Sequence, residues 1–154
     1  MRWIALILIA AIAAFMAYVR LSPTPVERVH QAGTARDPGD VQTEGSFAAV
    51  RALRVTPEQA LIRVQEIAEA TPRTRLFVGS VAEGMMTFET RSRVFGFPDY
   101  TTVSIIPEGA APGGNTTPLI MLYGRLRFGQ GDMGVNKARI ESWLAQMDGV
   151  ITRP

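Results

Sequence analysis

The sequence predicts an α+β domain: an antiparallel sheet of four to five strands with two helices packed on one face, preceded by an N-terminal transmembrane helix. An uncharged apolar run opens the chain, and two amphipathic helical patterns occur at residues 57–70 and 134–147. Between them, segments alternate apolar with polar residues, as strands do. Because one face of these strands is apolar and the other carries arginines, the pattern favours an antiparallel sheet covered by helices on one side.

The opening run, residues 3–19, carries no charge and is bracketed by Arg2 and Arg20. A helix rises about 1.5 Å per residue, so with its flanking residues this run approaches the ~30 Å hydrocarbon core of a bilayer. Trp3 and Tyr18 stand where interfacial aromatic residues are common. A cleaved signal peptide is the alternative, since residues 11–13 read A-I-A. The apolar run continues six residues past that site, so we expect residues 1–21 to be an uncleaved anchor.

Residues 22–48 are rich in Pro, Gly, Thr and charge, which predicts a flexible tether and places the soluble domain at residues 49–150. His30, the only histidine, lies in this tether, and no Cys or second His gives it metal-ligand spacing. We therefore expect no metal site and no cofactor. The lack of cysteine fits an oxidising and a reducing compartment equally well.

The charge balance argues against nucleic-acid binding, although the sequence pI is about 9.5. Of the 16 basic residues, Arg2 and Arg20 flank the anchor, and the rest equal the 14 acidic residues in number. The soluble part is therefore neutral overall and contains no basic block.

Residues 56–59 predict the start of the first domain helix. Thr56 is expected at the N-cap and Pro57 at the first helical position, and Gln59 completes a capping box. The apolar stripe that should face the core consists of Ala60, Leu61, Val64, Ile67 and Ala68.

Strands are predicted at residues 74–81, 85–95, 100–107 and 119–128, with a short additional strand within residues 50–55. In the last of the four, Ile120 and Leu122 share one face, whereas Arg125 and Arg127 share the other. The final helix should bury Ile140, Trp143, Leu144 and Met147, and Asn136 falls on the same buried side.

Two segments, residues 91–99 and 125–139, share a pattern: arginines at i and i+2, followed by Gly-x-x-Asp. If their strands are neighbours, the arginines form a cationic patch beside a helix N-terminus, which suits a phosphate or a carboxylate. The candidate anion-binding residues are Arg91, Arg93, Asp99, Arg125, Arg127, Asp132, Asn136 and Arg139. The alternative is a surface network of Arg–Asp pairs that fixes the fold, with Asp132 capping the last helix.

Two enzymatic interpretations have less support in the sequence than an anion-binding site. Residues 129–134 read G-Q-G-D-M-G, which matches the dinucleotide fingerprint in letters only, because no second parallel strand follows the helix. No Ser–His or Cys–His dyad exists within the domain, so no catalytic residue is assigned. A hydrolase-like enzyme that uses Asp132 with the arginine pairs is the remaining catalytic alternative.

Three motifs resemble the family called domain of unknown function 1499, over about residues 50–147. They are P-R-T-R (72–75), R-S-R-V-F-G-F-P-D-Y-T-T (91–102) and R-L-R-F-G-Q-G-D-M-G-V-N-K-A-R-I (125–140). The resemblance implies a set of motif positions and no reaction: Arg91, Ser92, Asp99, Arg127, Gly129, Asp132, Gly134, Asn136 and Arg139. Gly124, Leu126 and Gly131 stand where serine is frequent in the family.

Members of this family occur mainly in bacteria and photosynthetic eukaryotes, and their domain often follows an N-terminal signal or membrane segment. The expected protein is therefore an envelope protein anchored through residues 1–21 in a bacterial inner membrane, single-pass, with a periplasmic domain. Its expected role is a binding or accessory module with an arginine-rich face, acting on a small anion, a lipid head group or an envelope protein. A protein-docking scaffold is the alternative, and no nucleic-acid partner is expected.

Overall fold

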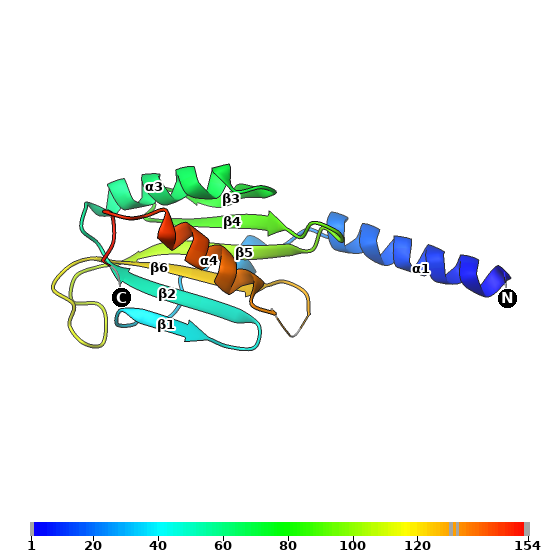
Figure 1. Cartoon of the computed structure of the whole chain (residues 1–154), viewed down its shortest axis with the longest axis horizontal. Helices are drawn as coiled ribbons and strands as arrows, with labels where there is room; N and C mark the ends of the chain where they lie inside the picture. The colour runs from blue at the N-terminus through cyan, green and yellow to red at the C-terminus, as the bar shows by residue number, and fades with distance from the viewer. Residues whose placement is uncertain (1, 130, 132, 153–154) are drawn as a thin grey trace.

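A six-stranded antiparallel sheet forms the centre of the fold, in the order β1-β2-β6-β5-β4-β3 (Figure 1). The computed structural model describes residues 2–129, 131 and 133–152. The strands are β1 (Gly39–Gln42), β2 (Ser46–Ala52), β3 (Thr74–Ser80), β4 (Met85–Arg91), β5 (Pro98–Ile106) and β6 (Leu119–Leu126). The helices are α1 (Arg2–Leu21), α2 (Val26–Val29), α3 (Pro57–Ala70) and α4 (Val135–Ala145).

The α+β class with an antiparallel sheet is confirmed, but the predicted number of four to five strands is wrong. The missed strand is β1, which pairs with β2 from Gly39 opposite Val50 to Gln42 opposite Phe47. All four β1 residues are exposed, so the strand has no alternation of apolar and polar residues that a sequence pattern could reveal.

Helices α3 and α4 pack on one face of the sheet, α3 along β3 and α4 across β2 and β6 (Figure 1). The capping box of α3 is confirmed, since the Gln59 amide donates to Thr56 Oγ1 and the Thr56 amide donates to Gln59 Oε1. The buried stripe of α3 is also the predicted one. In α4, Asn136, Ile140 and Trp143 are buried, and the Trp143 ring meets Phe88 edge-on at 5.7 Å. These contacts form the main core.

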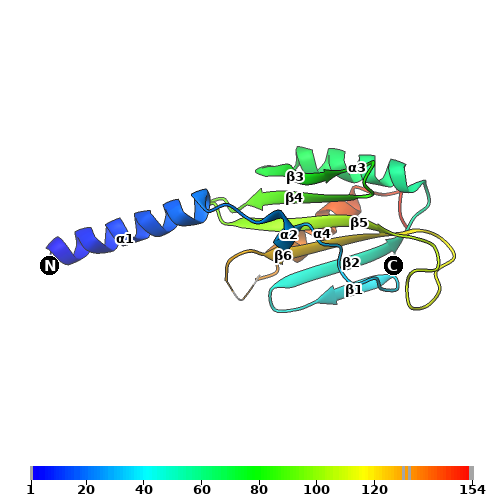
Figure 2. The same ribbon diagram turned by 180° about the vertical axis from the view of Figure 1, so that it is seen from behind.

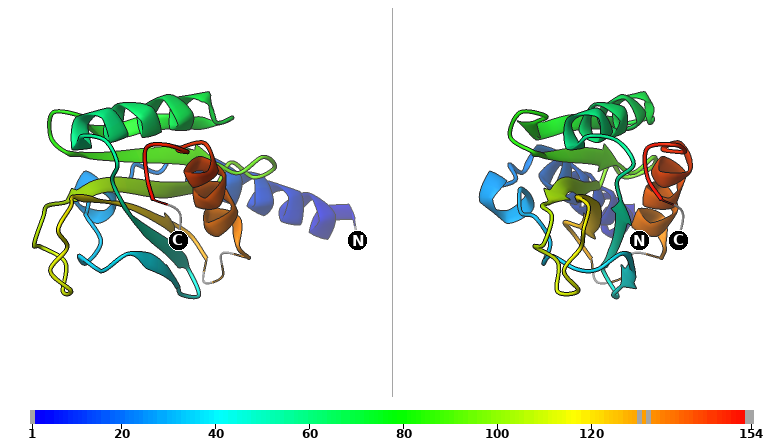
Figure 3. Two further views of the ribbon diagram at one scale, coloured as in Figure 1. Left: turned by 60° about the vertical axis from the view of Figure 1, so that its left-hand side comes forward. Right: turned by 90° about the vertical axis from the view of Figure 1, so that its left-hand side faces the viewer.

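The opposite face of the sheet is covered by residues 22–38, which we call the strap (Figure 2). Val29 is 3 % exposed, and its carbonyl oxygen accepts hydrogen bonds from Thr102 Oγ1 at 3.0 Å and from Arg125. The Tyr100 hydroxyl donates to Thr24 Oγ1 at 2.7 Å. Seen end-on, the sheet separates the strap from α3 and α4 (Figure 3).

The prediction of a flexible tether over residues 22–48 is therefore corrected. Its Pro and Gly content indicates irregular backbone, and the strap is irregular apart from the short helix α2, but irregular backbone can still pack. The strands present hydroxyl and guanidinium groups on this face, and buried polar groups need partners. The backbone carbonyls of the strap supply these hydrogen-bond partners. Composition alone therefore does not predict that the strap packs on the sheet.

The strand β4 ends at Arg91, four residues before the predicted end. The chain turns at residues 92–97: the Ser92 amide donates to Phe97 O, and Gly96 adopts a φ of 71°. Arg93 and Val94, which the alternation placed on opposite faces of a strand, thus lie in a loop. Likewise β6 ends at Leu126, two residues before the predicted end.

Helix α1 projects from one end of the sheet and is almost entirely exposed (Figure 1). It is long and apolar enough to cross a membrane, a property that signal sequences share. We call the end of the sheet beside this helix the α1 end. There β4 and β6 finish and β3 and β5 begin, so both arginine motifs lie at the same end of the sheet.

Candidate functional site

The predicted site residues that the structure describes lie near the α1 end, but they are divided between the two faces of the sheet. Arg91, Arg125 and Arg127 face the strap, whereas Asp99, Asn136 and Arg139 lie on the side of the helices. Arg93 lies in the loop between β4 and β5. Asp132, including its predicted role as a helix cap, lies outside the described residues; the N-cap position of α4 is Gly134. The seven predicted residues that the structure describes therefore do not form one patch.

On the helix side, three predicted residues form a buried polar cluster. Arg139 donates to Asp99 Oδ2 at 3.2 Å and to Asn136 Oδ1 at 2.8 Å. The Arg139 and Asp99 side chains are 9 % and 10 % exposed, and Asn136 is fully buried, as predicted. Gly124 makes room for it, because a Cβ there would lie 3.0 Å from Asn136 Cβ. This cluster links α4 to β5 and is buried, whereas the structural alternative places the Arg–Asp pairs on the surface.

On the strap side, two arginines bind the chain just beyond α1. Arg127 donates to Ser22 O at 2.8 Å and to Pro23 O at 2.9 Å. Arg125 donates to Val29 O, and burial lowers the pKa of its guanidinium below its ordinary value, an effect that the neighbouring Tyr123 partly offsets. The last carbonyl groups of a helix lack partners within the helix, and cations near them are favourable. Both arginines therefore hold the strap and the end of α1 against the sheet.

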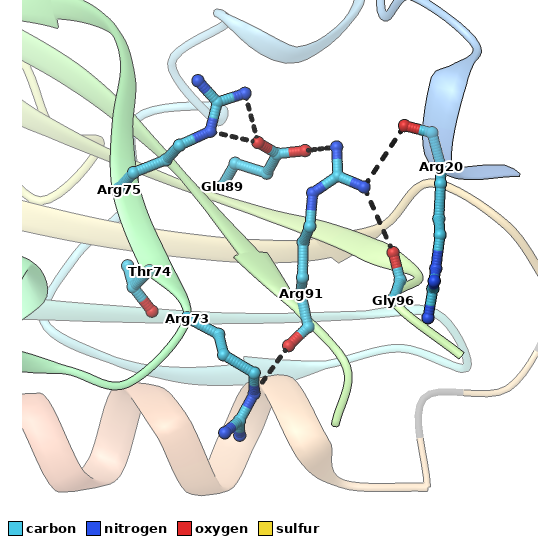
Figure 4. Close-up of a pocket in the computed structure, with 7 residues that line it drawn as sticks. All are labelled: Arg20, Arg73, Thr74, Arg75, Glu89, Arg91 and Gly96. Carbon is cyan, nitrogen blue, oxygen red and sulfur yellow. Dashed lines mark hydrogen bonds and ion pairs between the residues drawn. The ribbon is translucent and has the colours of Figure 1, made fainter. Parts of the chain in front are cut away.

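A third group of arginines surrounds a cleft of about 480 Å³ at the edge strand β3, which we call the arginine cleft (Figure 4). Its lining residues are Arg20, Arg73, Thr74, Arg75, Glu89, Arg91 and Gly96. Four arginines thus surround one carboxylate. Arg20 comes from the last turn of α1, so the cleft lies where this helix meets the sheet.

The carboxylate of Glu89 organises the arginine cleft. Glu89 is 2 % exposed, and its two oxygens bind different arginines: Oε2 accepts from Arg75 Nε at 2.6 Å, and Oε1 lies 2.7 Å from an Arg91 nitrogen (Figure 4). Arg91 also donates to the carbonyl oxygens of Arg20 and Gly96, each at 3.4 Å. A buried carboxylate without partners would be strongly unfavourable, so Glu89 fixes where Arg75 and Arg91 lie.

Arg73 occupies a strained backbone position on the rim of the cleft. Its φ is 61°, a value that residues other than glycine adopt rarely. Its Nε donates to Arg91 O at 3.1 Å. The Arg91 amide in turn donates to Arg73 O at 3.0 Å, so hydrogen bonds with β4 hold Arg73 in this conformation.

Arg73 and Arg91 also line a second cleft of about 470 Å³ on the helix side. Arg93, Asp99 and Arg139 contribute to it, with Ser92 and Ser142 adding hydroxyl groups. The two clefts therefore share one rim at the corner where β3 begins and β4 ends.

The sequence prediction missed Arg20, Arg73, Arg75 and Glu89. Arg20 was assigned only to the anchor flank, because nothing in the sequence shows that the domain folds back against it. Glu89 carried a usable signal: two positions before Arg91 on one strand, it must share that residue's face. Arg73 and Arg75 belong to the motif at residues 72–75.

Chemically, the arginine cleft suits an anion, because guanidinium groups bind phosphate and carboxylate oxygens with paired, charge-assisted hydrogen bonds. Within residues 2–129, 131 and 133–152, no group of three or more His, Cys, Asp or Glu side chains is placed to hold a metal ion.

A family model described as "Protein of unknown function (DUF1499)" matches residues 21–147. This covers most of the chain, which therefore belongs to that family. The match begins at the end of α1 and includes the strap and β1. A search of curated proteins gives no match to the chain.

Proposed function

We propose that this DUF1499 chain is a single-pass, membrane-anchored binding module whose arginine cleft takes an anionic group at the membrane surface. One observation carries the proposal: Arg20, in the last turn of the apolar helix α1, lines the same cleft as Arg73, Arg75 and Arg91. If α1 spans a bilayer, the cleft lies at the level of the lipid head groups.

The anchoring part of the proposal is supported by the way the domain holds the end of α1. Arg91 donates to Arg20 O, Arg20 Nε donates to Phe95 O, and Arg127 donates to Ser22 O. These contacts make the last turn of α1 part of the folded unit, which favours a retained anchor over a cleaved signal. The membrane that we propose is a bacterial inner membrane with the domain on the periplasmic side, as the sources of this family suggest.

The ligand class follows from the charges in the cleft. Its four arginines exceed its single carboxylate, and the Arg75 side chain is 64 % exposed, so that it remains accessible to a ligand. A lipid head-group phosphate and a free phosphate share the chemistry that such a cleft recognises. The position beside α1 favours the lipid, because a tethered domain meets head groups at high effective concentration.

The Arg73→Gln variant of the full chain, in uncharged detergent micelles, should bind inorganic phosphate about tenfold more weakly than the wild type. A charge-assisted hydrogen bond contributes about 1.5–3 kcal/mol, and tenfold in affinity corresponds to about 1.4 kcal/mol. Isothermal titration calorimetry measures this directly. Arg54→Gln is the matched control, since Arg54 is an exposed arginine at the other end of the sheet.

A second variant at the same position separates binding from folding. Arg73→Gly removes the guanidinium but suits the φ of 61°, so its melting temperature should stay near that of the wild type. Weak binding by both variants, with Arg54→Gln unchanged, supports the cleft. Equal binding by all of them would overturn it and favour the protein-docking scaffold.

A further inference from the structure

Two loops at the α1 end leave large apolar side chains in solvent. In the loop between β4 and β5, Val94 is 68 % exposed and Phe95 is 47 % exposed; before α4, Met133 is 96 % exposed. Elsewhere in the described domain, apart from Val135 at the start of α4, the exposed large apolar side chains are Val26, Val41 and Ile62, none above 44 %. Exposed apolar residues gathered in one place mark an interaction surface.

The backbone at Met133 is strained as well. Its φ is 47°, although it is neither glycine nor asparagine. A strained conformation that also exposes an apolar side chain is unfavourable twice over in water. Entry of the side chain into an apolar environment removes the cost of exposing it to water and so offsets the backbone strain.

Both loops reach back along α1 instead of stopping at its end. The Phe97 ring contacts Phe15 at 6.2 Å between centroids, and Phe128 contacts Tyr18 at 6.5 Å. Phe15 precedes Leu21 by six residues, a rise of about 9 Å along the helix. In both side views the loop between β4 and β5 lies against the end of α1 (Figures 1 and 2).

Basic residues border the same surface. Arg93 lies beside Val94 in the first loop, and Arg20 and Arg127 stand at the foot of α1. Aromatic and apolar side chains together with arginines are the composition that settles at the boundary between head groups and acyl chains. Attraction to anionic lipids would add to this preference.

We propose that residues 92–97 and Met133, which precedes α4, enter the head-group region of the same bilayer that α1 spans. The occupant of this surface is a lipid bilayer containing anionic lipids, because the exposed side chains continue the apolar surface of α1. The inference rests on the anchoring described under Proposed function. It adds a fixed position and orientation of the domain on the bilayer surface, which we call its seating. It would hold the opening of the arginine cleft at the lipid phosphates.

The test uses the full chain, which contains no cysteine, so single cysteines can be placed at will. Val94→Cys and Met133→Cys report on the loops, Ile62→Cys on α3 is the exposed control, and Ile9→Cys reports on the middle of α1. Each variant is labelled with an environment-sensitive fluorophore and reconstituted into vesicles of phosphatidylcholine and phosphatidylglycerol. Nitroxide lipids with the spin label near the head group or deep in the acyl chains then act as quenchers.

The expected result is that the labels at positions 94 and 133 shift to shorter wavelengths and lose emission to the shallow quencher. The label at position 62 stays sensitive to aqueous iodide, and the label at position 9 responds to the deep quencher. If position 9 is deep but positions 94 and 133 behave like position 62, the seating is overturned and the anchor stands. If position 9 is not deep, the anchor fails and the seating with it. Signals that depend on protein concentration would assign the loops to a second copy, and so overturn the seating too.

Discussion

The variant Trp143→Ala should lower the free energy of unfolding of the domain by about 4 kcal/mol, the largest effect that we expect from a single substitution. Trp143 is 1 % exposed, and its ring meets Phe88 edge-on with an interplanar angle of 85°. Its indole nitrogen donates to Thr71 Oγ1 at 2.9 Å. Truncation leaves a cavity between α4 and the sheet and removes the hydrogen bond that Thr71 Oγ1 accepts from the indole.

Urea denaturation of the full chain in uncharged detergent measures this loss. Trp143→Phe is the matched control, because it keeps an aromatic ring against Phe88 and loses the indole N–H. It should cost about 1–2 kcal/mol. Equal losses for the two variants would mean that the hydrogen bond, and not the packing of the ring, fastens α4.

The second large effect is expected at Arg91. Replacement by Leu should lower the free energy of unfolding by about 3 kcal/mol, because among the described residues it leaves the buried carboxylate of Glu89 with Arg75 alone as a charged partner. Arg75 is mostly exposed and compensates poorly, since its charge is shared with water. Replacing the other partner, Glu89→Gln, should lower the free energy of unfolding by less, because Arg75 and Arg91 both keep access to solvent.

A double-mutant cycle tests this account of the pair. The variant that combines Arg91→Leu with Glu89→Gln should be more stable than Arg91→Leu alone, since the unpaired buried charge is gone. Arg75→Leu serves as the control and should cost at most about 1 kcal/mol. If the double variant is the least stable of the set, Arg91 contributes through packing and the charge pair has no special part.

Much of the fold could be predicted because its signals are local. The capping box at residues 56–59 fixes the start of α3 through hydrogen bonds within four residues. The burial of Asn136 follows from its place on the stripe of α4. The strand β1 and the strap gave no such signal, since their structure depends on partners far away in the sequence: β2 for the strand, and Thr102 and Arg125 for the strap.

For the candidate site, the sequence did not reveal on which face of the sheet each residue lies. Residues 91–99 look like one arm of a site, but Arg91 pairs directly with Pro98 across the hairpin. Cross-strand partners share a face, so Asp99 must point to the other side of the sheet. The same register places Glu89 opposite Tyr100, and Tyr100 opposite Arg125, on the face of the strap. Without the register, which depends on the end of β4 at Arg91, the sequence could not divide the arginines correctly.

The arginine cleft at the membrane surface is the central claim, and hydrogen exchange of the full chain in lipid nanodiscs tests it most directly. Amide exchange over residues 72–75 and 91–97 is compared between phosphatidylcholine alone and phosphatidylcholine with phosphatidylglycerol. We predict slower exchange in these segments with the anionic lipid, and no such difference for Arg73→Gln. Identical exchange in the two lipid mixtures for the wild-type chain would contradict the claim that the cleft binds anionic head groups.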